Sequence, residues 1–489
     1  MRWLCGLGVG MALMACGDDS GATRDASADA AGRDSGERDS GSDAGERDAG
    51  GDVGERDAGG RDAGGRDSGA GTDAGAACAF PAPFDEGATY ARTLYVQAGS
   101  DGDGTEASPF GDIEDAAAVA TPGTRVLVRA GTYDRVRSIS PQGSAAEPIK
   151  FEAEGEVIID GTDNTGWSMS DARYVVVEGF TIRDASVHGM NLDDGGSYDT
   201  PAEFVVLRDI TIPSAGSGGN NDCIKMSGVD NFWILESDVA GCNRGEIVDM
   251  VGCHDGVIAN SRFAAPVGNG VQAKGGSSDT LVTGNVFEDI PGRGVNAGGS
   301  TGLEFFRPID APHEAARIRV VANLFLRGGT ESGAPIAFVG CDACEFLNNT
   351  VIEPQGWIAR ILQETTGDRF VPSREGRFAN NLIVVNVDDL RTWFNVGGGT
   401  APETFRFETN LWFALDRDDF TGPTYAGGIP DGVEDVVMDP QLVDRAGGDY
   451  RLSAGSPAAA AGSDVGALPP DLSGRCFQDP PAIGGYEAP

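Results

Sequence analysis

The chain has 489 residues and a formal net charge of −40, with 76 acidic side chains against 36 basic ones. Such acidity argues against nucleic acid and anionic lipid surfaces as partners, because both would be repelled. Beyond the N-terminus, no run approaches the roughly 18 apolar residues of a membrane-spanning helix. We therefore expect a monomeric protein whose only attachment to a membrane is at its N-terminus.

Residues 1–15 are predicted to be a signal peptide. Met1-Arg-Trp opens a short apolar run that ends at Leu13-Met-Ala-Cys16, with a small residue before the cleavage point. This end resembles the lipobox of bacterial lipoproteins, and an ordinary secretory signal is the alternative. The resemblance implies that Cys16 becomes the lipidated N-terminus of an exported protein. Its location would then be the bacterial cell envelope, at the outer membrane or the cell surface.

Residues 16–77 form a low-complexity segment built on Arg-Asp-Ala-Gly and Arg-Asp-Ser-Gly units. Almost no side chain there is both apolar and larger than alanine, so burial cannot repay the entropy of ordering. The segment is predicted to be a solvated linker that holds a single domain, residues 78–489, off the membrane.

The domain opens with a strand at Tyr95, a Gly/Asp loop, a short helix and a second strand that ends at Tyr133. Apolar residues at helical spacing over 113–119 predict that helix, which would cover the open end of a stack of coils. This order resembles the start of pectate-lyase-like right-handed parallel β-helix proteins. The resemblance implies an all-β right-handed parallel β-helix (single-stranded solenoid) with a short N-terminal capping helix. Its coils would span about 92–415, and a C-terminal cap, about 416–489, would fold back over the last coil.

A repeat of 24 residues indicates the solenoid independently. Val239, Phe263 and Phe287 close three successive coils at that interval, which suits one turn of a β-solenoid. In later coils the polar turn carries asparagine, which tolerates left-handed backbone geometry and can bond from coil to coil when stacked. This predicted ladder comprises Asn285, Asn323, Asn349, Asn381 and Asn410. Longer intervals there leave two insertions, 303–315 and 365–376, which we expect to wall a groove beside Lys274.

Seven of the nine cysteines belong to the domain, and export permits disulfides. Cys78 and Cys476 lie at its two ends and are candidates for a pair, although spacing alone does not settle the pairing. Cys341-Asp-Ala-Cys344 has no second CxxC or histidine pair at zinc spacing, which argues against a zinc site.

Two of only three lysines, Lys225 and Lys274, fall on the central strands. Partial burial can lower the pKa of lysine, as proton abstraction beside a carboxylate requires; a surface ion pair is the alternative for each. Strict 24-residue alignment matches Lys225 with Asp249 but turns Lys274 towards the core. We expect the Gly275-Gly276 pair to shift the register, because an unpaired ammonium in an apolar core is costly.

Carboxylates near these lysines suggest a cation site. Asp222 and Glu246 are one coil apart, and Asp249 follows closely, so the three could bind Ca²⁺ on a sheet face. Solvated turn carboxylates are the alternative.

The segments Gln272-Ala-Lys274-Gly-Gly and Gly292-Arg293-Gly-Val-Asn296 resemble the chondroitinase B and alginate lyase family of polysaccharide lyases. The resemblance implies that Lys274 is the base, that an arginine one coil later assists, and that acids just before the lysine hold Ca²⁺. The chain departs from this pattern, since Asn296 stands about where arginine is expected, Arg293 is three residues early, and residues 267–271 contain no acid.

Our hypothesis is an extracytoplasmic protein that binds an acidic uronate polysaccharide and cleaves it by β-elimination. Lys274 or Lys225 would remove the C5 proton, and Arg293 or Arg360 would neutralise the carboxylate. Substrate-binding candidates are Arg360, Asn296, Gln272 and Glu364, although Arg360 and Glu364 could equally form a structural pair. The alternatives are a uronate C5-epimerase and a noncatalytic cell-surface glycan-binding or structural lipoprotein.

Overall fold

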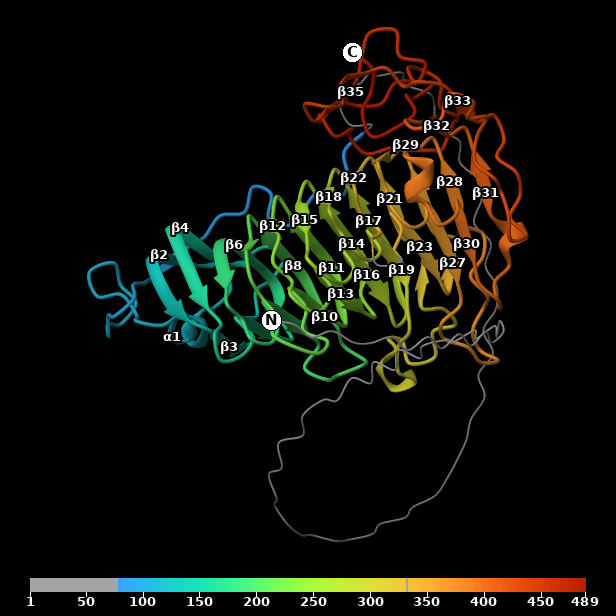
Figure 1. Cartoon of the computed structure of the whole chain (residues 1–489). Helices are drawn as coiled ribbons and strands as arrows, with labels where there is room; N and C mark the ends of the chain where they lie inside the picture. Colours follow the sequence, from blue (N-terminus) through green and yellow to red (C-terminus); the bar gives the residue numbers. More distant parts are fainter. Residues whose placement is uncertain (1–77, 331–332) are drawn as a thin grey trace, which may run out of the picture. The chain divides into compact units, whose positions relative to one another are not determined.

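The computed structural model describes residues 78–330 and 333–489, all within one compact unit. The predicted signal peptide, Cys16 and the linker lie outside the described residues. The fold is a right-handed parallel β-helix, as predicted. Strands from successive coils pair in parallel and stack along one axis (Figure 1). In the described part of the chain, no helix has the length and apolar character needed to cross a membrane.

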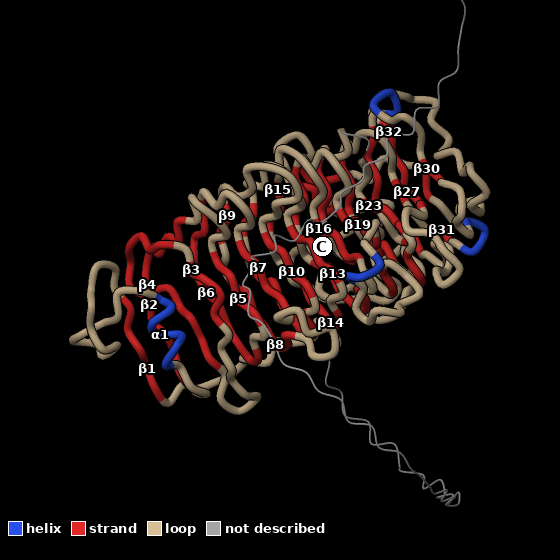
Figure 2. Tube along the Cα trace, turned by 90° about the horizontal axis from the view of Figure 1, so that it is seen from below, coloured by secondary structure: helices blue, strands red, loops and turns tan. Residues whose placement is uncertain are grey.

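One sheet takes a single short strand from each of ten coils, and Figure 2 shows these strands side by side along the axis. Its strands are β3 (Val136–Ile139), β5 (Trp167–Ser170), β7 (Met190–Asp193), β10 (Ile224–Ser227), β13 (Val248–Val251), β16 (Val271–Lys274), β19 (Val295–Gly298), β23 (Ile336–Val339), β27 (Ala359–Leu362) and β30 (Phe394–Val396).

The remaining wall of the solenoid is one sheet of 23 strands. These are β1 (Arg92–Val96), β2 (Thr124–Asp134), β4 (Ile149–Asp160), β6 (Arg173–Arg183), β8 (Ala202–Arg208), β9 (Thr211–Ile212), β11 (Val229–Leu235), β12 (Asp238–Val239), β14 (His254–Ala259), β15 (Arg262–Ala264), β17 (Ser277–Thr283), β18 (Val286–Glu288), β20 (Ala315–Ala316), β21 (Arg319–Val321), β22 (Leu324–Leu326), β24 (Cys341–Asp342), β25 (Glu345–Leu347), β26 (Thr350–Ile352), β28 (Arg377–Ala379), β29 (Leu382–Val385), β31 (Arg406–Glu408), β32 (Leu411–Ala414) and β33 (Val436–Val437). Val239, Phe263 and Phe287 stack in register, so the 24-residue period is confirmed for these coils.

A short helix covers one end of the stack. Helix α1 (Ile113–Val119) lies at the β1 end and buries Ile113 and Ala116 in the core, which confirms the predicted helix. Short 3₁₀ turns follow at η1 (Leu303–Phe305), η2 (Val387–Asp389) and η3 (Pro402–Thr404).

The C-terminal segment contains the hairpin β34 (Leu442–Asp444) and β35 (Asp449–Leu452) and packs on the flank of the later coils (Figure 1). The expectation that the cap folds over the last coil is confirmed for its first part, where Tyr425 stacks on Phe394 of β30 at 5.1 Å between ring centroids and Ile429 joins the core. It is wrong for the later part. Ala458 and Ile483 instead join a cluster with Leu326, Leu382 and other outward side chains of the large sheet. The segment packs there because it removes the apolar side chains of that flank from water.

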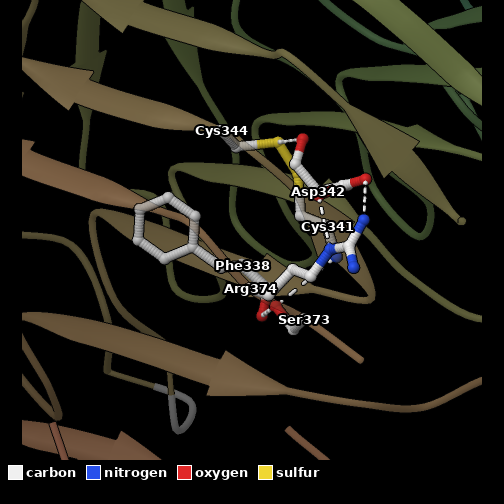
Figure 3. The surroundings of a disulfide bond; sticks show 6 residues. All are labelled: Phe338, Cys341, Asp342, Cys344, Ser373 and Arg374. Atoms are coloured by element: carbon white, nitrogen blue, oxygen red, sulfur yellow. Dashed lines mark hydrogen bonds and ion pairs between the residues drawn. A yellow bond between two sulfur atoms is a disulfide. The ribbon is translucent and has the colours of Figure 1, made fainter. Parts of the chain in front are cut away.

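Three disulfides join cysteines of the described chain, and Cys253 is the free thiol within it. Cys78 pairs with Cys476, so the candidate link between the two ends is confirmed. Cys223 pairs with Cys242. Cys341 and Cys344 pair across a tight turn whose Ala343 has a φ of 55° (Figure 3). The two sulfur atoms are thus bonded to each other.

The asparagine ladder is confirmed. Each of the five side chains is buried, and the Oδ1 of each of the last four accepts the backbone N–H of the ladder asparagine one coil earlier, at 2.9–3.0 Å. Left-handed geometry belongs to the residue before each ladder position, such as Asn348 and Asn380, rather than to the ladder asparagine itself. The ladder amides therefore act as hydrogen-bonding partners inside the core.

Replacing Asn349 by alanine is expected to lower the free energy of unfolding by about 3 kcal/mol. Its Oδ1 accepts both the backbone N–H and the Nδ2 of Asn323, at 2.9 and 3.0 Å, and buried donors left without a partner cost roughly 1–3 kcal/mol each. The midpoint of urea unfolding measures the loss. Alanine at the exposed Asn243 is the matched control, expected to cost less than about 1 kcal/mol. Equal losses for the two variants would contradict a special role for the ladder.

Candidate functional site

The outer face of the ten-stranded sheet carries the predicted polar residues. Alternation along β10 places Ile224 and Met226 in the core and turns Lys225 outward. Lys225 lies in register with Asp249 of β13, and Asp249 with Gln272 of β16. Residues from three coils thus share one row, because parallel pairing repeats the same facing in every coil.

Lys274 lies on this same outer face, in register with Val251. Two residues separate Val251 from His254 but three separate Lys274 from Ser278, although both end pairs are in register. The extra residue is taken up at Gly275-Gly276, where φ is 63° and 94°, values that favour glycine. The expected register shift is confirmed.

His254, on β14 of the preceding coil, contacts this glycine pair. Its Nδ1 lies 2.7 Å from Asp230 Oδ1, and its Nε2 lies 3.2 Å from the carbonyl oxygen of Gly276. Two acceptors favour the doubly protonated ring. Burial alone would lower the pKa of His254, but the hydrogen bond and charge of Asp230 outweigh it and raise the pKa above its usual value.

A histidine whose pKa is raised by folding stabilises the protein fully below its unfolded pKa, and this contribution disappears as the pH rises through the folded pKa. We expect His254→Gln to lower the free energy of unfolding by roughly 1–2 kcal/mol at pH 5.5, the scale of a charge-assisted hydrogen bond, and by much less at pH 9. Urea unfolding at the two pH values measures the difference. Asp230→Asn should show the same pH dependence, and a difference that is constant with pH would contradict the assignment.

Three carboxylates converge beside the row. Ligand atoms of Asp222, Glu246 and Asp249 lie within 4.8 Å of one another, as the sequence predicted. Asp222 and Asp249 are fully buried, and Glu246 is partly exposed. The backbone N–H of Glu246 donates to Asp222 Oδ1 at 2.9 Å, but Asp222 Oδ2 and Glu246 Oε2 are buried and accept no hydrogen bond. Buried oxygens without a donor are a feature that a bound cation would satisfy.

Both lysines point into this carboxylate cluster. Lys225 pairs with Asp249 and lies 3.8 Å from Asp222 Oδ2, whereas Lys274 Nζ lies 3.4 Å from Asp249 Oδ1. Only 12% and 8% of the two lysine side chains are exposed. If all three carboxyl groups and both lysines were ionised, the cluster would carry one uncompensated negative charge in a nearly closed site.

The ionisation of these groups is set by their neighbours. Burial and the charge of Asp249 raise the pKa values of Asp222 and Glu246. Burial also disfavours ionisation of Asp249, but Lys225 and Lys274 outweigh it and hold its pKa well below the usual range. Burial alone would lower the pKa of Lys274, but the charge of Asp249 outweighs burial and raises that pKa. The expectation of a lowered lysine pKa is therefore wrong here for Lys274, since sequence alone did not reveal how close Asp249 lies.

A chain of hydrogen bonds continues the row towards the later coils. Gln272 Nε2 donates to Asp249 Oδ1 at 3.1 Å, and Asn296 Nδ2 donates to Gln272 Oε1 at 2.7 Å. Arg293 Nη1 donates to Asn296 Oδ1 at 2.9 Å, and Arg293 Nη2 to Glu364 Oε1 at 2.7 Å. Although Arg293 precedes the expected position by three residues, its guanidinium reaches the side chain of Asn296.

Arg360 belongs to the same row at a distance from the lysines. It lies on β27, in register with Ala337, which is itself in register with Asn296. Its Nε donates to Asn395 Oδ1 at 2.9 Å, and burial, together with the charge of Arg293, lowers the pKa of Arg360 to about 10. Glu364 forms an ion pair with Arg293 at 2.7 Å.

The two insertions pack against each other next to Lys274. Phe306 and Phe370 stand 5.3 Å apart between ring centroids, and the backbone N–H of Val371 donates to the carbonyl oxygen of Pro312 at 2.9 Å. Glu314 accepts the backbone N–H of Gly275 at 2.8 Å and so ties the first insertion to the end of β16. Lys274 is only 6% exposed. The first insertion therefore lies beside Lys274, as expected, but the lysine is buried rather than in an open groove.

Three contributors to the site were missed from the sequence: Glu314, Asn269 and His188. Asn269 Nδ2 donates to Glu246 Oε1 at 3.1 Å, and its flanking glycines were the available signal. His188 Nδ1 accepts the backbone N–H of Asp222 at 3.0 Å. It belongs to the coil of β7, and the long segment between β7 and β10 hides its alignment with the cluster.

Comparison with known proteins agrees with the architecture. The family model described as a right handed beta helix region matches residues 157–308. An uncharacterized protein of Bacillus subtilis (strain 168), YwoF, is 33% identical over 122 residues, which are 22% of this chain and 25% of that protein. The chain thus matches only a quarter of the length of this curated relative.

Solved structures of similar fold include enzymes that act on polysaccharides. Pectate lyase Pel9A superposes with a TM-score of 0.52 at 13% identity, covering 82% of this chain and 98% of Pel9A. The PL6 family polysaccharide lyase Pedsa3628 from Pseudopedobacter saltans gives a TM-score of 0.43 at 14% identity, covering 76% of this chain and 98% of that one. At 13% identity the likeness to Pel9A shows a shared fold.

Proposed function

We propose that this protein is an extracytoplasmic β-helix enzyme that binds an acidic uronate polysaccharide and cleaves it by β-elimination. The observation that carries the proposal is the convergence of Lys225 and Lys274 with Asp222, Glu246 and Asp249 on one face. The groups come from three successive coils. Buried lysine and carboxylate groups that perturb each other's pKa values are typical of functional sites.

β-Elimination needs a base for the C5 proton and positive charge near the uronate carboxylate, where negative charge develops. We assign the base to Lys274, because Lys225 is engaged by both Asp249 and Asp222. Since Asp249 raises the pKa of Lys274, the lysine must first lose its proton, and a cation bound to the carboxylates would favour that loss by offsetting the charge of Asp249. Lys225 then balances the buried carboxylates. Arg293, whose guanidinium donates to Asn296, neutralises the substrate carboxylate. Arg360 and Glu364 remain substrate-binding candidates further along the row.

The residues present fit a Ca²⁺ ion. Asp222, Glu246 and Asp249 offer carboxylate oxygens, the ligands that Ca²⁺ prefers, and two of these oxygens are buried without a donor. A bound Ca²⁺ would supply positive charge to the uronate carboxylate and so favour loss of the C5 proton. The cluster would change from one excess negative to one excess positive charge, which a uronate balances. This would offset the repulsion expected between a polyanion and a chain of net charge −40.

For location, we propose export and attachment to the bacterial cell envelope through lipidated Cys16. The lipobox-like Leu13-Met-Ala-Cys16 supports this, and so do the three disulfides, since disulfides persist in oxidising compartments.

The test is to incubate the mature protein with a panel of uronate polymers and Ca²⁺ while following the absorbance of the new C4–C5 double bond. Cleavage of one polymer supports the lyase. Exchange of the C5 hydrogen with solvent deuterium without absorbance would indicate a C5-epimerase instead, which the second lysine, Lys225, could serve as proton donor. Binding without either reaction would indicate a noncatalytic glycan-binding protein and overturn the enzymatic proposal.

A further inference from the structure

Trp357 is in contact with two arginines, Arg360 of its own coil and Arg391 of the next coil. The guanidinium carbon of Arg360 lies 4.5 Å from the ring centroid of Trp357, and that of Arg391 lies 5.2 Å from it. The backbone N–H of Arg391 donates to the carbonyl oxygen of Gly356 at 2.8 Å, which fixes the next coil beside the ring. Trp357, Arg360 and Arg391 are called the Trp357 platform below.

The platform lies on the same face of the molecule as the lysines, further along the axis. Three register steps lead from Gln272 through Asn296 and Ala337 to Arg360. Adjacent strands are about 4.8 Å apart, so the platform is roughly 14 Å from the row of Gln272. Figure 2 shows β16, β19, β23 and β27 in this order along the axis.

The charge around the platform is opposite to that of the chain. Among the described residues whose charges act on Arg360, two are arginines, Arg293 and Arg391, and one is acidic, Glu364, in a protein whose net charge is −40. The repulsion of Arg293 contributes to the lowered pKa of Arg360. A bound anion would relieve that repulsion.

We propose that the Trp357 platform is a second binding site, which takes an acidic sugar unit of the same polysaccharide chain several units away from Lys274. The indole ring holds the two guanidinium groups in place, and these groups can bind the carboxylate of a sugar unit through paired hydrogen bonds. The inference rests on the proposed function for the class of ligand. It adds that the protein binds an extended oligouronate rather than a single sugar unit.

The test compares a uronate hexasaccharide with a disaccharide, using Trp357→Ala and the ring-preserving control Trp357→Phe in a Lys274→Met background that prevents cleavage. Calorimetry measures affinity, and quenching of tryptophan fluorescence reports occupancy next to Trp357. We expect Trp357→Ala to weaken hexasaccharide binding about tenfold, the effect of losing roughly 1.4 kcal/mol of interaction. Disaccharide bound beside Lys274 should quench little. Arg391→Gln, which leaves the backbone hydrogen bond in place, should also weaken hexasaccharide binding.

Equal affinity of Trp357→Ala and the Trp357→Phe control for the hexasaccharide would overturn the inference, and so would failure of the parent protein to bind any oligouronate. Cleavage that depends on Lys274 while Trp357 is dispensable would leave the proposed function standing alone. Conversely, binding that depends on Trp357 without cleavage by the wild-type protein would support the platform and reject the lyase.

Discussion

Lys274→Met is expected to reduce uronate cleavage by about three orders of magnitude, within the range that general-base catalysis contributes. Methionine has a similar length and lacks the amine, so packing beside Gly299 is largely kept while proton abstraction is lost. Lys274→Arg should be as inactive as the methionine variant, because arginine keeps the charge but does not release its proton. Initial rates of absorbance increase measure both variants.

Lys150 supplies the matched control for these substitutions. It lies on β4 in the other sheet and pairs with Glu152 and Glu178 at 3.2 and 2.9 Å. Lys150→Met therefore removes a similarly ion-paired lysine without touching the proposed site, and its cleavage rate should match the wild type. If Lys274→Met and Lys150→Met cleave equally fast, Lys274 is not the base.

Chelation of divalent cations is expected to abolish cleavage, and Ca²⁺ to restore it. Glu246→Gln and Asp222→Asn each remove one anionic ligand while preserving shape, so each should weaken Ca²⁺ binding at least tenfold. Calorimetric titration of the protein with CaCl₂ measures this independently of cleavage. Glu178→Gln, which alters a carboxylate of the other sheet, is the control and should leave Ca²⁺ affinity unchanged.

Replacing Lys225 tests whether the carboxylates bind a cation or are neutralised by the lysines alone. Its ammonium pairs with Asp249 and lies 3.8 Å from Asp222, so it competes with a cation for the same oxygens. Lys225→Met should therefore raise the affinity for Ca²⁺. No heat of binding in either protein, together with full activity in chelator, would reject the metal and leave the two lysines to balance the carboxylates.

Much of the architecture could be predicted because it is local and periodic. Strand alternation and the spacing of Val239, Phe263 and Phe287 specify a coil that repeats, and parallel stacking then follows from burying the apolar side of every coil. The position of the C-terminal segment could not be predicted in this way. It depends on an apolar flank assembled from side chains of several coils, which no single stretch of sequence displays.

The sequence by itself determined the solenoid, the asparagine ladder and the residue types of the site: two lysines on central strands, with acids one coil apart. Only the tertiary structure decided that Gly275-Gly276 absorbs an extra residue, that Lys274 faces the carboxylates, and that Glu314 ties the first insertion to the end of β16. It also decided the ionisation of Lys274, which Asp249 raises against the effect of burial. Alternation along a strand is a local property, whereas a one-residue shift between coils and the charge of a neighbour 25 positions away act only after the coils have stacked.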